Sequence, residues 1–175
     1  MKLRVALLLS FVLVLIAFVP ASADQPVLWY ENDWDVTFDL VNCGSFTVLD
    51  RAVGHDSEYL YYDKDGKVVK TLYENRGVDN LFSSANPDVV VSGPYRFLVH
   101  AKVTAYDVNG DVTNVTRRWT GNIWNIQLPG KGGVYHESGQ IVELFDVVNW
   151  TVIAEIKRVG LTVFDNQALC EYFAD

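Results

Sequence analysis

The chain has 175 residues, of which 50% are apolar, and its 22 acidic and 14 basic side chains give a formal net charge of −8. An acidic surface repels nucleic acid and anionic lipid, so the composition argues against both as partners. The largest basic cluster is Arg117-Arg118, and the net charge otherwise only favours solubility.

Residues 1–23 predict a secretory signal peptide rather than part of the fold. Met1–Arg4 is a basic n-region, Val5–Val19 is almost wholly apolar, and Ala21–Ala23 fits a small-residue cleavage site. The apolar run is shorter than the ~20 residues of a membrane-spanning helix, which leaves a retained anchor only as the alternative. We therefore predict cleavage after Ala23, a secreted protein with no stable membrane insertion, and one β domain at 24–175.

The first half of the mature chain alternates apolar and polar residues in short stretches, which is typical of strands. These stretches are Asp35–Asn42, Ser45–Val53, Glu58–Asp63, Lys67–Glu74 and Asp88–Ser92. Residues 24–34 are expected to drape over the domain. Residues 75–87 are rich in Asn, Ser and Pro and predict a loop.

The segment Tyr95–Phe145 predicts three long strands joined by two tight turns. Tyr95–Tyr106 alternates throughout, and Asn109-Gly110 in the following turn supplies the positive φ angles of a hairpin. The apolar phase of Val112–Leu128 changes beside Gly121-Asn122, which predicts a β-bulge there. The third strand is expected at Val134–Phe145.

The last elements are a strand at Asn149–Val159 and a short helix at Asp165–Phe173, with Asp165 as its N-cap. Cys43 and Cys170 are the two cysteines of the chain, and in an exported protein such a pair predicts a disulfide. Consecutive hairpins without a long helical pattern predict an all-β fold. We expect a single-domain antiparallel β-barrel of about eight strands, with a β-sandwich as the alternative.

The block Leu128–Glu143 places a glycine turn before a strand with the pattern acidic-small-Gly-x-Ile/Val. This block resembles a segment of small secreted bacterial β-rich proteins of unknown function, and the similarity extends to about a third of the mature chain. The resemblance implies an exported bacterial β domain and assigns no site residue.

No catalytic residue, metal ligand or cofactor is predicted. The sequence has no G-x-S-x-G motif, Walker loop or dinucleotide fingerprint. Asp63–Gly66 and Asp107–Asp111 resemble parts of a calcium loop but have no downstream Glu at the required spacing, so both are interpreted as hairpin turns. His100 and His136 could come together with Glu137 on neighbouring strands, where they would serve as acid and base in a small barrel enzyme of the isomerase or cyclase type.

Tryptophans are the more informative candidates for a binding site. Trp119 and Trp124 lie on either side of the predicted bulge, so one is expected to face in and the other out. Aromatic rings at a barrel mouth hold apolar or sugar ligands. We therefore expect a non-enzymatic domain that binds a small ligand or an extracellular protein, with Trp119, Trp124, His100 and His136 as candidate residues. The alternatives are the small enzyme and an oligomerising structural protein.

Overall fold

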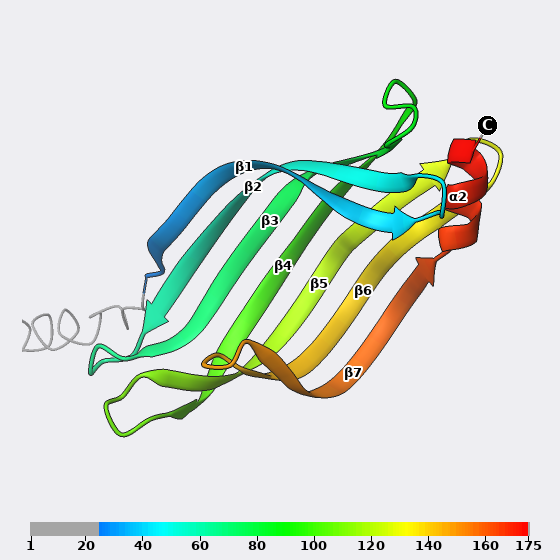
Figure 1. Cartoon of the computed structure of the whole chain (residues 1–175). Coiled ribbons are helices and arrows are strands. Elements are labelled where there is room, and N and C mark those ends of the chain that lie inside the picture. Colours follow the sequence, from blue (N-terminus) through cyan, green and yellow to red (C-terminus); the bar gives the residue numbers. More distant parts are fainter. Residues whose placement is uncertain (1–24, 175) are drawn as a thin grey trace, which may run out of the picture.

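The computed structural model describes residues 25–174, which form one antiparallel sheet followed by a short helix (Figure 1). The elements are β1 (Val27–Asn42), β2 (Thr47–Tyr62), β3 (Val68–Ser83), β4 (Val90–Tyr106), β5 (Val112–Leu128), β6 (Gly132–Asp146), β7 (Thr151–Phe164) and α2 (Asn166–Ala174). The order of the strands in the sheet is their order in the sequence, and each neighbouring pair is antiparallel. The fold is therefore an up-and-down meander of consecutive hairpins.

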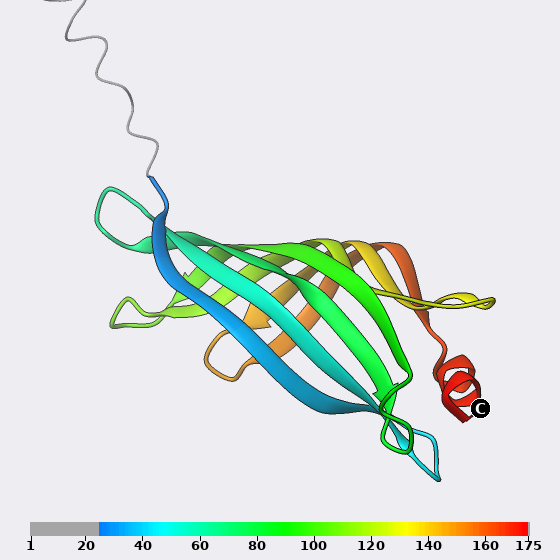
Figure 2. The ribbon, with the colours of Figure 1, turned by 90° about the horizontal axis from the view of Figure 1, so that it is seen from above.

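The sheet is strongly curved and forms a trough (Figure 2). Trp34 on β1 and Tyr95 on β4 are separated by two strands, yet their ring centroids are only 6.2 Å apart. Side chains so far apart in a sheet can stack only on the inside of its curve. The face that carries these rings is therefore the concave one, and we call it the trough. Strands of 14 to 17 residues make it roughly 50 Å long at ~3.3 Å per residue.

The trough is open along one side. Within residues 25–174, the outer edges of β1 and β7 are not paired with any strand. Because seven strands alternate in direction, β1 and β7 run the same way along the sheet (Figure 1).

Three glycines at one level of the sheet allow it to bend. Gly121, Gly139 and Gly160 are register neighbours on β5, β6 and β7, and their φ angles are 126°, 122° and 137°. A Cβ atom at each position would lie within 2.4 Å of a carbonyl oxygen on the adjacent strand. Glycine is required here for both reasons, and such glycine kinks are the device by which sheets acquire strong curvature.

A second pair of glycines makes room for an aromatic ring inside the trough. Gly54 on β2 and Gly77 on β3 are directly opposite each other. A Cβ atom would lie 2.4 Å from the Tyr95 hydroxyl oxygen at Gly54 and 2.3 Å from it at Gly77. The Tyr95 side chain therefore occupies the space that two ordinary side chains would fill.

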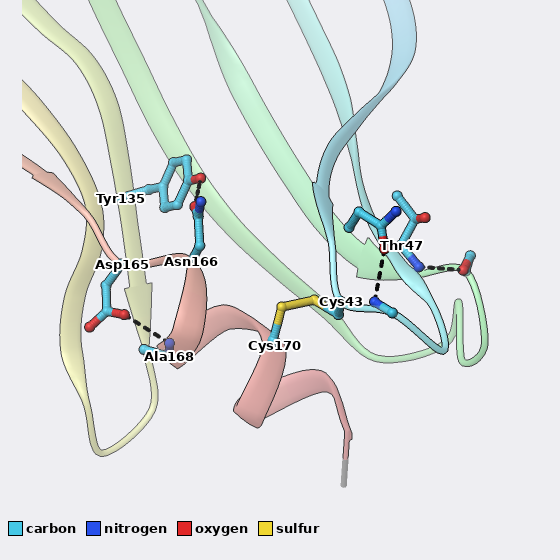
Figure 3. Close-up of a disulfide and its surroundings, with 10 residues drawn as sticks. Cys43, Thr47, Tyr135, Asp165, Asn166, Ala168 and Cys170 are labelled. Atoms are coloured by element: carbon cyan, nitrogen blue, oxygen red, sulfur yellow. Dashed lines mark hydrogen bonds between the residues drawn. A yellow bond between two sulfur atoms is a disulfide. The ribbon is translucent and has the colours of Figure 1, made fainter.

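The end of the trough near α2 is packed and covalently tied (Figure 3). Asp165 caps the helix, because its Oδ1 accepts the N–H of Ala168 at 2.9 Å. The sulfurs of Cys43 and Cys170 lie at disulfide distance, with their Cα atoms 5.5 Å apart. Leu169 and Phe173 of α2 are buried in the main apolar cluster. The strand residues of that cluster are Val41, Val48, Leu81, Val91, Ile126, Leu128, Val134 and Tyr135.

Several predictions from the sequence are confirmed. The segment Tyr95–Phe145 does belong to three strands joined by two turns, and the fold is all-β with one short C-terminal helix capped by Asp165. The bulge lies where the phase changes, since the β5–β6 register skips Ile123 between Asn122 and Trp124. The Cys43–Cys170 pairing is also found. The predicted signal peptide, residues 1–23, lies outside the described residues.

The expected closed barrel of about eight strands is not what the structure shows, because seven longer strands form an open sheet. The two predicted strands on either side of Gly54 are one strand, β2, whose ladder continues through the glycine. The predicted strand Asp88–Ser92 and the strand from Tyr95 are likewise joined as β4 across Gly93-Pro94.

Two segments without predicted strands also belong to the sheet. Residues 27–34 are the first half of β1 and do not drape over the domain. Residues 75–83 complete β3 and are not a loop, because their polar side chains at Asn75 and Asp79 point into the trough instead of into solvent.

Candidate functional site

A row of aromatic rings crosses the trough from β1 to β5. Trp34 stacks on Tyr95, with an interplanar angle of 17°. Tyr95 contacts Phe97 at a centroid distance of 6.2 Å, and Phe97 contacts Trp119 at 5.5 Å. The row exists because Tyr95 and Phe97 are two residues apart on β4 and therefore share its inner face.

A hollow of about 230 Å³ lies along this row. Its walls are mainly apolar and come from five strands, β1 to β5. The lining residues are Trp34, Val36, Phe38, Ala52, Asn75, Asp79, Tyr95, Phe97, Ile123 and Trp124. Val36 and Phe38 are 49% and 41% exposed, so the hollow is reached from the open side of the trough beside β1.

Two carboxyl groups are buried at the floor of the trough. The register places Asp79 opposite Ala52 and Asp50 opposite Leu81, so the two aspartates are diagonal neighbours on β2 and β3. Burial raises the pKa of Asp50 to about 6, against the opposing effect of the Asn80 N–H that it accepts. Burial, and then the neighbouring charge on Asp50, raises the pKa of Asp79 to about 8. At neutral pH the pair therefore shares one proton, held mainly by Asp79.

A short hydrogen-bond chain lies beside the carboxyl pair. The Asn75 amide donates from Nδ2 to the Tyr73 hydroxyl at 2.8 Å, and that hydroxyl donates to Asp56 Oδ2 at 2.8 Å. These two hydrogen bonds fix the orientation of the Asn75 amide and of the Tyr73 hydroxyl. As a result, the carbonyl oxygen of Asn75 and the second oxygen of Asp56 are left as acceptors.

Three oxygen atoms of this region have no hydrogen-bond partner among the described residues, and they belong to Asp56, Asn75 and Tyr95. The second oxygens of Asp50 and Asp79 have no partner except each other, through the proton that the pair shares. All five side chains are more than nine-tenths buried. Buried polar atoms in proteins nearly always have a partner, and each orphan costs about 1–3 kcal/mol. Such a concentration of orphan oxygens beside a hollow is the arrangement expected of a site that is completed by another molecule.

The other half of the trough has its charges paired. Glu143 accepts from Arg117 Nε and from the indole N–H of Trp119, both at 2.7 Å. Glu137 pairs with Arg158 across β6 and β7. The uncompensated polar atoms are therefore concentrated on β2 to β4, beside the hollow.

The structure brings together some of the sequence-derived candidates and separates others. Trp119 and Trp124 both lie in the trough, where Trp119 contacts Phe97 and Trp124 lines the hollow. The expectation that one would face out is wrong, because the bulge at Ile123 shifts the phase and returns Trp124 to the inner face. Trp124 therefore also packs edge-on against Tyr135.

His100 and His136 lie on the convex face, away from Glu137 in the trough. His100 pairs with Arg118 of β5, and His136 pairs with Asn125. Arg118 and Asn125 are seven positions apart on β5, so the two histidines that pair with them are separated by roughly 20 Å along the sheet at ~3.3 Å per residue. Burial lowers the pKa of His100, and His136 contacts the Ser138 hydroxyl at 2.8 Å. These three side chains do not converge on a common acid–base site.

Sequence reasoning missed the buried carboxyl pair, although a signal was present. Asp50 has the same strand phase as Val48 and Ala52, and Asp79 has the same phase as Leu81. An acidic residue in the buried phase of a strand is uncommon and often functional. The partner could not be identified without the β2–β3 register.

The two calcium-like turns are hairpin turns, as predicted. Asp107 Oδ1 accepts the N–H groups of Asn109 and Asp111, and Asp63 Oδ1 does the same for Asp65 and Lys67. In residues 25–174, no group of three or more acidic, histidine or cysteine side chains is arranged to hold a metal ion. In the same part of the chain, α2 is too short to span a membrane, and no longer apolar helix occurs.

No family model, no curated protein and no solved structure matches the chain. The resemblance of Leu128–Glu143 to small secreted bacterial β-rich proteins therefore stays a prediction.

Proposed function

We propose that this protein is an exported, non-enzymatic β domain that binds a small ligand in the trough. The observation that supports this most directly is the aromatic-walled hollow of about 230 Å³, whose wall contains the orphan oxygens of Asn75 and Tyr95 and the buried Asp79 carboxyl. Ligand sites are typically concave and mainly apolar, with a few polar groups that orient the ligand. Export is supported by the signal-like residues 1–23 and by the Cys43–Cys170 pair, since disulfides persist in oxidising compartments.

The proposal is tested with a neutral apolar dye, N-phenyl-1-naphthylamine, whose fluorescence rises in an apolar site. We expect saturable binding that Phe38→Arg weakens about tenfold or more, because the side chain lines the hollow. Phe38 is 41% exposed, so the variant is expected to fold. Thr37→Arg, one residue away on the convex face of β1, is the matched control and should bind the dye as the wild type does.

Dye binding that does not saturate, or that Phe38→Arg and Thr37→Arg affect equally, would count against a site in the trough. A thermal-shift screen with lipids, sugars and amines then identifies the class of ligand, because a ligand that binds only the folded state raises the melting temperature.

Self-association through β7 is a second candidate function, and the exposed edge of the sheet favours it. Val152, Ile153, Ile156, Val159, Leu161 and Phe164 are each 47% to 61% exposed. Apolar side chains on both faces of an unpaired edge strand promote pairing with another chain.

Light scattering over a hundredfold range of concentration tests this candidate. A second copy is the expected partner, and Val159→Lys should shift the protein toward the monomer because a charged side chain on an edge strand opposes pairing. A wild-type protein that stays monomeric at the highest concentration would contradict self-association and leave ligand binding unaffected.

A further inference from the structure

The hollow has an acidic side and no basic side chain to balance it. None of its ten lining residues is Lys, Arg or His, whereas Asp79 is one of them. Asp50 adjoins Asp79 on the next strand, and Asp56 lies further along β2. The charges of Glu143 and Glu137, by contrast, are already matched by Arg117 and Arg158. The local charge therefore favours a cation as ligand.

The orphan atoms around the hollow are mostly acceptors. One of the two amide N–H groups of Asn75 donates to Tyr73, and its carbonyl oxygen has no partner. Asn75 Oδ1 lacks a partner, and Asp79 Oδ2 has none except the Asp50 carboxyl. Asn75 and Asp79 both line the hollow and are 8% and 4% exposed. A ligand that satisfies them has to donate hydrogen bonds, as a protonated amine does with its N–H groups.

The aromatic walls also suit a positive charge. Trp34, Tyr95 and Phe97 present their rings to the same hollow. A cation over a ring face is attracted by the negative charge of the π system, most strongly where water is excluded. The Tyr95 phenol remains neutral, because burial, followed by the nearby charge of Asp79, raises its pKa.

We propose that the ligand of the trough is an organic ammonium ion, whose N–H groups bond to the Asp79 carboxyl and whose body lies against the aromatic row. This inference rests on the proposed ligand-binding function and adds the chemical class of the ligand. The ammonium group takes the place of the proton that Asp50 and Asp79 share, so that proton passes to solvent when the amine binds. The other titratable group beside the pair is the Tyr95 phenol, whose pKa is raised by burial and then by the charges of Asp79 and Asp50 among others.

Two probes of matched size test the inference by titration calorimetry at pH 7. The probe 2-phenylethylamine carries an ammonium group, and 2-phenylethanol has the same ring and chain length with a neutral hydroxyl. We expect the amine to bind about tenfold or more tightly than the alcohol. We also expect close to one proton to be released per amine, measured as a difference in binding heat between phosphate and HEPES buffers.

The Asp50→Asn/Asp79→Asn variant keeps the volume of both side chains and removes their charge. It should bind both probes with similar affinity and release no proton. Asp39→Asn removes one charge, as many as the pair carries at pH 7, from an exposed position and should retain the preference for the amine. Equal affinity of the wild type for the two probes would overturn the ammonium inference and leave the proposed ligand site standing. If neither probe displaces the bound dye, the inference is also wrong; if the dye itself fails to bind, the proposed function falls with it.

Discussion

The Asp50–Asp79 pair makes the stability of the fold decrease as the pH rises, and Asp79→Asn tests this directly. An Asp carboxyl has an ordinary pKa of 3.8, whereas the folded protein raises the pKa of Asp50 to about 6 and that of Asp79 to about 8. Between pH 4 and pH 8 the folded state therefore keeps protons that the unfolded state has released. The contribution of the pair is fully present below about pH 4 and is lost as the pH rises through 6 and 8.

The magnitude follows from the pKa of Asp79. Each tenfold difference in proton affinity corresponds to about 1.4 kcal/mol, so the difference between 3.8 and about 8 sets an upper limit of roughly 6 kcal/mol at pH 9. Relaxation and water entry reduce such penalties, and we expect about half of that limit. Asparagine is neutral at every pH and can donate its amide hydrogen to Asp50. Asp79→Asn should therefore match the wild type at pH 4.5 and exceed its free energy of unfolding by roughly 2–3 kcal/mol at pH 9.

Urea unfolding at both pH values, followed by tryptophan fluorescence, measures this difference. Asp39→Asn is the control, because Asp39 is exposed on the convex face and its removal changes the net charge by the same amount. The reasoning is refuted if Asp79→Asn changes stability equally at pH 4.5 and pH 9, or if Asp39→Asn reproduces its gain at high pH.

Two further substitutions test how the trough is shaped and tied. Gly77→Ala places a Cβ atom 2.3 Å from the Tyr95 hydroxyl oxygen and should lower the free energy of unfolding by about 1–3 kcal/mol or more. Gly133→Ala is the control, because its Cβ atom meets no atom within 4 Å, and it should leave the urea titration nearly unchanged. Replacing Cys43 and Cys170 together with Ser opens a loop whose ends are 127 residues apart and should cost about 3–5 kcal/mol. A double variant as stable as the oxidised wild type would show that the bond does not stabilise the fold.

The local parts of the fold could be predicted because the relevant signals lie close together in the sequence. Alternation over Tyr95–Tyr106, the Asn109-Gly110 turn and the phase change near Gly121 each specify a feature within about ten residues. The number of strands could not be predicted in this way. Gly54 and Gly93-Pro94 look like breaks in the sequence, whereas in the sheet the absence of a side chain at each glycine leaves room for other residues. The Tyr95 ring of β4 occupies the space at Gly54, and the Asn125 backbone and the Ile126 side chain of β5 occupy the space at Gly93.

The candidate site shows the same limit. Trp119 and Trp124 are candidates that the sequence alone reveals, because aromatic residues on either side of a bend are visible in one segment. Asp50 and Asp79 come from different strands, and their proximity depends on a register that only the folded sheet defines. The two histidines were grouped by strand proximity alone, and strand parity places both on the convex face.

The common direction of β1 and β7 has a mechanical consequence for the trough. β1 ends one residue before Cys43, and β7 ends shortly before the helix that carries Cys170. The disulfide therefore links the two edge strands of the sheet at the end near α2. Because the edge strands are joined only at this end in the described part of the chain, the distance between them can vary least beside α2 and most at the opposite end of the sheet. The end of the trough remote from α2 is therefore where β1 and β7 can separate most, whereas the disulfide fixes their separation beside the helix.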